Sequence, residues 1–139
     1  MKIPFLSFAL FFLAGCATVP SQNLCPILNV ARSYDLTFTY GRADINADAQ
    51  KTLTEMASSA VRNREKICIA GMTDYDGAPD NLTALSLTRA QNVADLFVEN
   101  GVKIKNIYLI LSPNVAQTGV WRPDSSKNVR HVVHIDVGL

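Results

Sequence analysis

The spacing of apolar residues along this chain changes from segment to segment. Some segments have the two-residue period of a strand, and others have the 3.6-residue period of a helix. Residues 36–40 alternate leucine, phenylalanine and tyrosine with two threonines, which is the period of a strand. Residues 67–71 form a short, wholly apolar run that ends in glycine, as expected of a buried central strand. Two further strands are predicted over residues 107–111 and 133–137, the second with apolar residues at every other position.

Two stretches carry apolar residues at helical spacing, over residues 49–61 and 82–97. Asn46 is a suitable N-cap for the first helix, and Asp48 lies in the first turn, where the helix dipole favours a carboxylate. Gly101 ends the second helix, because glycine readily adopts the left-handed conformation. The order β-α-β-α-β-β predicts an α/β (α+β) two-layer sandwich in which both helices pack on one mixed sheet.

The first residues of the chain have a different pattern. An apolar run over residues 3–13 follows Met1-Lys2 and is shorter than the ~20 residues that cross a bilayer, so it fits a secretory signal peptide. Residues 13–16, Leu-Ala-Gly-Cys, resemble the lipobox of bacterial lipoproteins, in which cleavage precedes an acylated cysteine. An ordinary signal peptide with an incidental cysteine is the alternative.

The lipobox resemblance implies three segments. Residues 1–15 would be a lipoprotein signal peptide, residues 16–33 an acylated N-terminus and tether, and residues 34–139 the folded domain. Cys16 would carry the acyl chains, palmitate among them, and several chains together give stable anchoring. Because Ala17 rather than aspartate follows Cys16, we expect a lipid anchor in the outer membrane with the domain in the periplasm.

The two remaining cysteines, Cys25 and Cys68, are candidates for a disulfide in an oxidising periplasm. Such a bridge would tie the N-terminal segment to a predicted core strand. The alternative is that Cys68, which lies between two isoleucines, is only a small buried apolar residue.

Composition narrows the class of protein. The chain has 139 residues, 48% of them hydrophobic and 18% charged, with 13 Lys and Arg against 12 Asp and Glu. This length favours one folded domain after the N-terminal segments, and the apolar periodicity argues against disorder. The formal net charge of +1 gives no basic surplus for nucleic acid, which we do not expect as a partner.

Asp74 and Arg89 are the candidate ligand-binding residues. Asp74 follows the predicted central strand, and ligand crevices in α/β sheets often open at the carboxyl ends of strands. Arg89 borders the core-facing side of the second helix, so its permanent charge would be partly desolvated. A carboxylate and a guanidinium side by side would bind a zwitterion, with the arginine holding the ligand's carboxylate in a two-pronged contact.

The residues from about 36 to 137 resemble the OmpA-like peptidoglycan-binding domain, as in peptidoglycan-associated lipoproteins. The family pattern Gly-His-Thr-Asp, a glycine three residues on, and Leu-Ser-x-x-Arg-Ala matches eight positions of this chain: Gly71, Thr73, Asp74, Gly77, Leu85, Ser86, Arg89 and Ala90. In the family, the aspartate and arginine bind the diaminopimelate residue of the peptidoglycan stem peptide. The resemblance implies the same roles for Asp74 and Arg89, with Thr73, Phe38, Thr39 and Arg130 as supporting residues.

The chain departs from the family pattern at several positions. Met72 replaces the usual histidine, Leu82 replaces an asparagine, and residues 111–113 replace a Gly-x-Gly. The closing Asn-Arg-Arg-Val is reduced to residues 129–132, Val-Arg-His-Val. These departures bear on affinity and ligand detail more than on the fold. They also keep open a second function, protein assembly within an envelope secretion or conjugation complex with other envelope proteins as partners.

Other chemistry has little support in the sequence. Asp74 and Arg89 can also be read as an internal ion pair that touches no ligand. His131 and His134 would point to opposite faces of a strand, so we expect no metal site. Ser86 has no identifiable base and no Gly-x-Ser-x-Gly turn, so we expect no enzyme, and no cofactor is implied.

Overall fold

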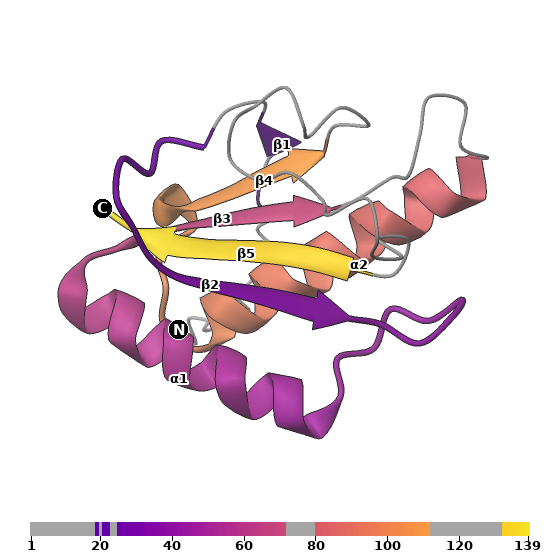
Figure 1. Ribbon diagram of the computed structural model, residues 1–139, viewed down its shortest axis with the longest axis horizontal. Coiled ribbons are helices and arrows are strands. Elements are labelled where there is room, and N and C mark those ends of the chain that lie inside the picture. The colour runs from indigo at the N-terminus through magenta and orange to yellow at the C-terminus, as the bar shows by residue number, and fades with distance from the viewer. Residues whose placement is uncertain (1–18, 20, 23–24, 72–79, 112–131) are drawn as a thin grey trace, which may run out of the picture.

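The protein forms a five-stranded mixed sheet with two helices packed on one of its faces (Figure 1). The computed structural model describes residues 19, 21–22, 25–71, 80–111 and 132–139. Along the chain the elements are β1 (Ser21–Gln22), β2 (Val30–Thr37), α1 (Ala47–Asn63), β3 (Lys66–Gly71), α2 (Asp80–Glu99), the 3-10 turn η1 (Ile104–Asn106), β4 (Ile107–Leu111) and β5 (Val132–Gly138). The predicted two-layer α/β order is confirmed, with β1 added before it.

The strand order in the sheet is β1-β4-β3-β5-β2. β4 runs parallel to β3, whereas β5 lies antiparallel between β3 and β2. The strands β2, β3 and β4 therefore end together where β5 begins, and we call this the carboxyl end of the sheet. At the opposite end, which we call the amino end, β2, β3 and β4 begin and β5 ends.

The core lies between the helices and one face of the sheet. Ile67 and Ile69 of β3 pack there with Leu53 of α1 and Phe97 of α2, all fully buried. The prediction of a buried central strand is confirmed, because β3 has a strand on each side and every residue but Lys66 is buried. Among the described residues, no helix is long and apolar enough to cross a membrane.

The start of α1 and the end of α2 agree with the sequence prediction. Asn46 is the N-cap of α1, and its side-chain oxygen accepts a hydrogen bond from the Ala49 N–H at 2.8 Å. After α2, Gly101 has φ +93°, and the N–H groups of Gly101 and Val102 donate to the carbonyls of Val98 and Phe97. This pair of bonds is the Schellman motif, which satisfies carbonyls that the last helical turn leaves open.

The predicted boundaries of the first strand were wrong. The structure begins β2 at Val30 and ends it at Thr37, so Phe38 and Tyr40 lie in the loop that follows. The chain turns at Gly41, whose φ is +68°, with the Arg42 N–H bonded to the Thr39 carbonyl at 3.0 Å. Thr37 pairs with Val132, the first residue of β5, so the ladder between β2 and β5 ends there, before the turn.

The segment expected to be only a tether also takes part in the fold. Ser21 and Gln22 pair with Leu109 and Ile110 of β4, and Val19 is buried in the core. Cys25 forms a disulfide with Cys68 of β3, with 5.8 Å between their Cα atoms, so of the two alternatives for these cysteines the structure has the bridge. Residues expected to be a free linker are thereby fixed to the sheet at three places, by β1, the disulfide and β2.

Candidate functional site

Arg89 lies at the carboxyl end of the sheet. It belongs to α2 and is 2% exposed, so its guanidinium is removed from water. Its Nη2 donates to the carbonyl of Thr39, two residues after the end of β2, at 3.2 Å. The structure therefore places this predicted site residue against the loop that follows the edge strand β2.

The guanidinium of Arg89 organises the loop between β2 and α1. Its Nε donates to the carbonyl of Arg42 at 2.7 Å, so two N–H groups bind carbonyls on either side of the turn at Gly41. One helical turn on, the side-chain amide of Asn92 donates to the carbonyl of Ala43 at 2.8 Å. Both side chains lie on one face of α2, and together they attach the loop to this helix.

Phe38 supplies the surroundings of this cation. Its ring is buried and lies under the guanidinium, with 5.0 Å between the ring centroid and the Arg89 Cζ. A cation over an aromatic face is attracted to the ring's negative charge. Burial lowers the pKa of Arg89 from its usual value. The group stays protonated at neutral pH, because the usual pKa of arginine lies far above neutrality.

The surface of the same loop is polar and exposed. Arg42 and Asp44 form an ion pair at 2.6 Å, with both side chains more than half exposed. Tyr40 stands out from the loop at 81% exposure. The loop thus presents an aromatic ring and a solvated ion pair next to the buried Arg89.

Several predicted site residues lie outside the described residues. These are Cys16, Thr73, Asp74 and Arg130. Of the remaining predicted residues, the structure brings Arg89, Phe38 and Thr39 into direct contact. The opposed pair of Asp74 and Arg89 stays a prediction. Ser86, for which the sequence shows no base, is buried in α2.

A second polar cluster, which sequence reasoning missed, lies between β2 and β5. Nδ1 of His134 is 2.5 Å from Asp35 Oδ1, and Nε2 of His134 is 3.0 Å from Asp136 Oδ1. Ser33 donates its hydroxyl to the same Asp136 oxygen at 2.5 Å. These side chains alternate with Val133, Ile135 and Val137, which face the core, so the cluster lies on the sheet face turned away from the helices.

The cluster is electrostatically coupled. Burial acts to lower the pKa of His134, but the hydrogen bonds and charges of Asp136 and Asp35 outweigh it and raise the pKa above its usual value. Burial acts to raise the pKa of Asp136, but His134 and Ser33 outweigh it and lower this pKa. The sequence showed that His134 and Asp136 share a strand face. It gave no register that would place Asp35 opposite them.

Neither cluster is arranged as a metal centre. Within the described ranges, no group of three or more histidine, cysteine or acidic side chains is placed to hold a metal ion. Glu65, just after the end of α1, is a buried acidic residue. It is 6% exposed and forms an ion pair with Arg32 at 2.5 Å.

Comparison with known proteins identifies the family. The sequence profile of the OmpA family matches residues 37–128, about two thirds of the chain. The chain belongs to the OmpA family. Outer membrane protein P5 of Haemophilus influenzae is 36% identical to it over 69 residues, which is 49% of this chain and 20% of that protein. The matched segment thus spans about a fifth of that relative.

Solved structures of OmpA-like domains share the fold. The OmpA-like domain of FopA1 from Francisella tularensis has a TM-score of 0.58 at 20% identity, covering 76% of this chain and 71% of that one. The peptidoglycan-associated lipoprotein from Burkholderia pseudomallei has a TM-score of 0.55 at 18% identity, covering 74% and 88%. At this identity the likeness establishes the fold.

Proposed function

We propose that this chain is an acylated lipoprotein of the outer membrane whose periplasmic domain binds peptidoglycan without a covalent bond. The ligand is the diaminopimelate residue of the stem peptide, bound by Asp74 and Arg89, and the protein performs no reaction. Membership of the OmpA family carries this proposal, because the matched residues 37–128 include both side chains. Cys16 carries the lipid that joins this domain to the membrane.

The surroundings of Arg89 support its role. Bonds to two backbone carbonyls and the ring of Phe38 fix the plane of the guanidinium before any ligand arrives. A fixed guanidinium loses little side-chain entropy on binding a carboxylate. Burial at 2% exposure also strengthens the attraction to a ligand anion, because little water screens it.

The position of Asp74 in the sequence agrees with this site. It follows Gly71, the last residue of β3, by three residues, so at most about 11 Å of extended chain separates it from the carboxyl end of the sheet. A carboxylate within that reach would bind the ligand's ammonium while Arg89 binds its carboxylate. Peptidoglycan repeats this ligand many times, so many anchored molecules would together attach the membrane firmly to the wall.

Co-sedimentation with purified sacculi tests the site. We expect Asp74→Asn to weaken retention about ten- to a hundred-fold, since removing one partner of a charged hydrogen bond costs about 1.5–3 kcal/mol. Asp44→Asn is the matched control, because it removes an exposed carboxylate from the neighbouring loop and should leave retention unchanged. Free diaminopimelate should compete with sacculi for the unmodified chain.

Arg89 needs a different substitution, because it also holds the loop. Arg89→Lys keeps the charge but loses the fork, so we expect a folded protein with weakened retention. Thermal unfolding of each variant separates loss of the ligand from loss of the fold. If folded Asp74→Asn and Arg89→Lys variants both sediment like the unmodified chain, the proposed site is wrong.

A further inference from the structure

Cations gather at the amino end of the sheet, away from Arg89. Five of the chain's 13 Lys and Arg residues lie where α1 leads into β3 and where α2 leads into β4: Arg62, Arg64, Lys66, Lys103 and Lys105. The acidic residue of these two connections, Glu65, is already paired with Arg32. Glu99, at the end of α2, lines a different groove with Gln50 and Asp95. A chain of net charge +1 therefore has a strongly positive end.

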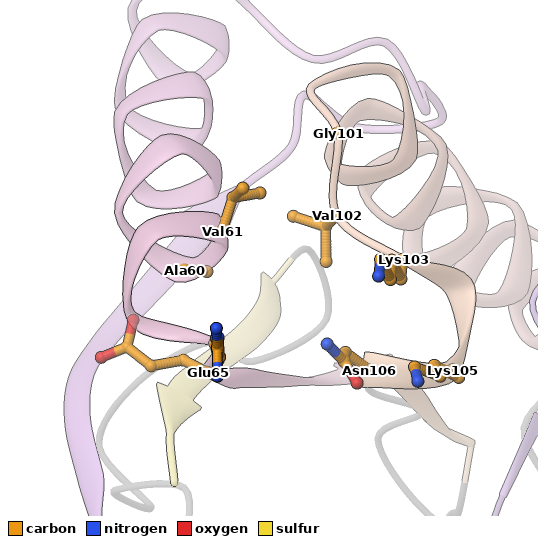
Figure 2. Close-up of a pocket in the computed structure, with 9 residues that line it drawn as sticks. Ala60, Val61, Glu65, Gly101, Val102, Lys103, Lys105 and Asn106 are labelled. Atoms are coloured by element: carbon orange, nitrogen blue, oxygen red, sulfur yellow. The ribbon is translucent and has the colours of Figure 1, made fainter.

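The same end is hollowed. A cavity of about 440 Å³ lies between the end of α1 and the segment from Gly101 to Asn106. Figure 2 shows Ala60 and Val61 of α1 on one side of it, with Val102, Lys103 and Lys105 on the other. The pocket thus has apolar walls next to cationic side chains, which suits an amphipathic anion.

Arg64 lines this pocket at a conformational cost. It has φ +57°, and among the described residues it is the non-glycine residue with a positive φ. Its N–H and that of Glu65 close α1 in a Schellman motif, the position that glycine fills after α2. A left-handed arginine costs about 1 kcal/mol relative to glycine, so this position carries a charge where a glycine would be less strained.

Exposed apolar side chains lie at this end as well. Val61 is 48% exposed on the pocket wall. Leu28 is 89% exposed and Val30 is 52% exposed, where β2 begins next to the end of β5. Apolar side chains interspersed with lysine and arginine are typical of surfaces that rest on the headgroup region of a membrane.

The path of the chain brings the proposed lipid to this end. β1 is parallel to β4, so it enters the sheet from the side where β4 begins, next to Lys105 and Asn106. Val19, two residues before β1, is buried in the core. Cys16 precedes Val19 by three residues, which span at most about 11 Å even when fully extended. A lipid on Cys16 would therefore hold the core close to the membrane surface.

We propose that the amino end of the sheet docks on anionic phospholipid headgroups of the membrane that holds the anchor. Arg64, Lys103 and Lys105 bind headgroup phosphates, while Val61 and Leu28 enter the interface. Docking rests on the proposed function for the anchor at Cys16 and for the ligand site at the opposite end of the sheet. The domain then stands with its carboxyl end directed away from the membrane, toward the wall.

Lysine labelling of the full chain on vesicles tests this orientation. An amine-reactive reagent is applied to the chain on phosphatidylcholine vesicles and on vesicles with about one third phosphatidylglycerol, and each lysine is quantified by mass spectrometry. We expect labelling of Lys103 and Lys105 to fall at least about threefold on the anionic vesicles. The labelling should recover near 1 M salt, because the electrostatic screening length is then only ~3 Å. Lys51 is the internal control, because it is exposed and lies about 20 Å from Arg64 along α1.

Charge variants sharpen the test. Arg64→Gln should reduce the protection of Lys103 and Lys105, whereas Lys51→Gln, which removes the same charge elsewhere, should not. Equal labelling of Lys103 and Lys105 on both vesicle types would overturn the docking. Protection of these lysines in whole envelopes but not on vesicles would also overturn it, because it would indicate that an acidic protein covers this end instead of lipid. Sacculus retention should be unchanged in Arg64→Gln. If the chain does not stay bound to phosphatidylcholine vesicles, the proposed lipid anchor at Cys16 is wrong. The docking is judged separately, by the labelling of Lys103 and Lys105 on the anionic vesicles.

Discussion

At the scale of single residues, buried charges in this domain are fixed by neighbours that differ in kind. Arg89 donates to two backbone carbonyls and lies over the ring of Phe38. His134 instead lies between two carboxylates, so its charge is balanced. Backbone carbonyls fix the position of the Arg89 guanidinium, whereas a histidine between two carboxylates is suited to holding two strands together.

The His134 cluster predicts how stability depends on pH. The raised pKa of His134 means that its contribution is fully present below about pH 6.5, the unfolded value, and is lost as the pH rises through the folded value. The lowered pKa of Asp136 means that its contribution is present above about pH 3.9 and is lost as the pH falls. The free energy of unfolding, measured with urea, should therefore decline on both sides of a range between these limits.

Two variants test whether His134 causes the loss of stability at alkaline pH. His134→Gln should remove most of it and lower stability at pH 6, because Asp136 keeps a buried charge without its partner. His131→Gln leaves the cluster's own histidine in place and should keep the decline. If His134→Gln and the unmodified chain lose the same free energy between pH 6 and pH 9, His134 does not carry a raised pKa.

The sequence predicted single residues where their chemistry is visible in one segment. Arg89 could be chosen because it borders the apolar side of a helix and matches a family pattern. Its bonds to Thr39 and Arg42 could not be predicted, since any residue can offer a carbonyl and no pattern marks which one does. The partnership of Asp35 with His134 depends on strand register between residues 99 positions apart, which the local pattern does not encode.

At the scale of elements, burial decided which boundaries were predictable. β3 is buried on both sides, and α1 has a capping residue and an apolar side, so both agree with the sequence pattern. The first half of β2 is an edge strand with little burial, where Arg32 binds Glu65 and Ser33 binds Asp136. The side chains of this half do not alternate between apolar and polar, so the sequence pattern predicts a tether there instead of a strand.

The disulfide joins two such elements, and its removal gives an element-level prediction. Cys25 and Cys68 close a loop of 43 residues that includes β2 and α1. We expect Cys25→Ala with Cys68→Ala to lower the free energy of unfolding by about 2–4 kcal/mol, because the unfolded chain regains the freedom of that loop. Alanine fits at the buried Cys68 without crowding.

Chemical denaturation with and without a reductant measures this effect. The reductant should lower the stability of the unmodified chain toward that of the double variant, and it should leave the double variant unchanged. Equal stability of the oxidised chain and the double variant would show that the bridge adds nothing to the fold. Free-thiol titration of the unfolded chain without reductant would count the unpaired cysteines, so a disulfide lowers that number by two.

At the scale of the whole molecule, the two proposed binding surfaces lie at opposite ends of the sheet. Arg89 and the loop it holds lie at the carboxyl end, while Arg64, Lys103 and Lys105 surround the pocket at the amino end. β3 connects the two ends over six residues, about 20 Å. With the proposed docking at one end and the proposed wall site at the other, the length of the sheet would set the distance between membrane and wall.

The short connection between Cys16 and Val19 should matter for docking more than for wall binding. Inserting about ten Gly and Ser residues after Ala17 adds a flexible reach of roughly 17 Å, which lowers the effective concentration of the cationic end at the membrane. Labelling of Lys103 and Lys105 on anionic vesicles should rise several-fold toward its value on neutral ones, whereas sacculus retention should stay the same, because the carboxyl end is unaltered. A proline-rich insertion of equal length should raise the labelling at least as much, because such a segment is stiff and extends about 31 Å. Retained lysine protection with loss of sacculus binding would contradict this arrangement, since it would place the wall site, rather than the cationic end, under control of the anchor.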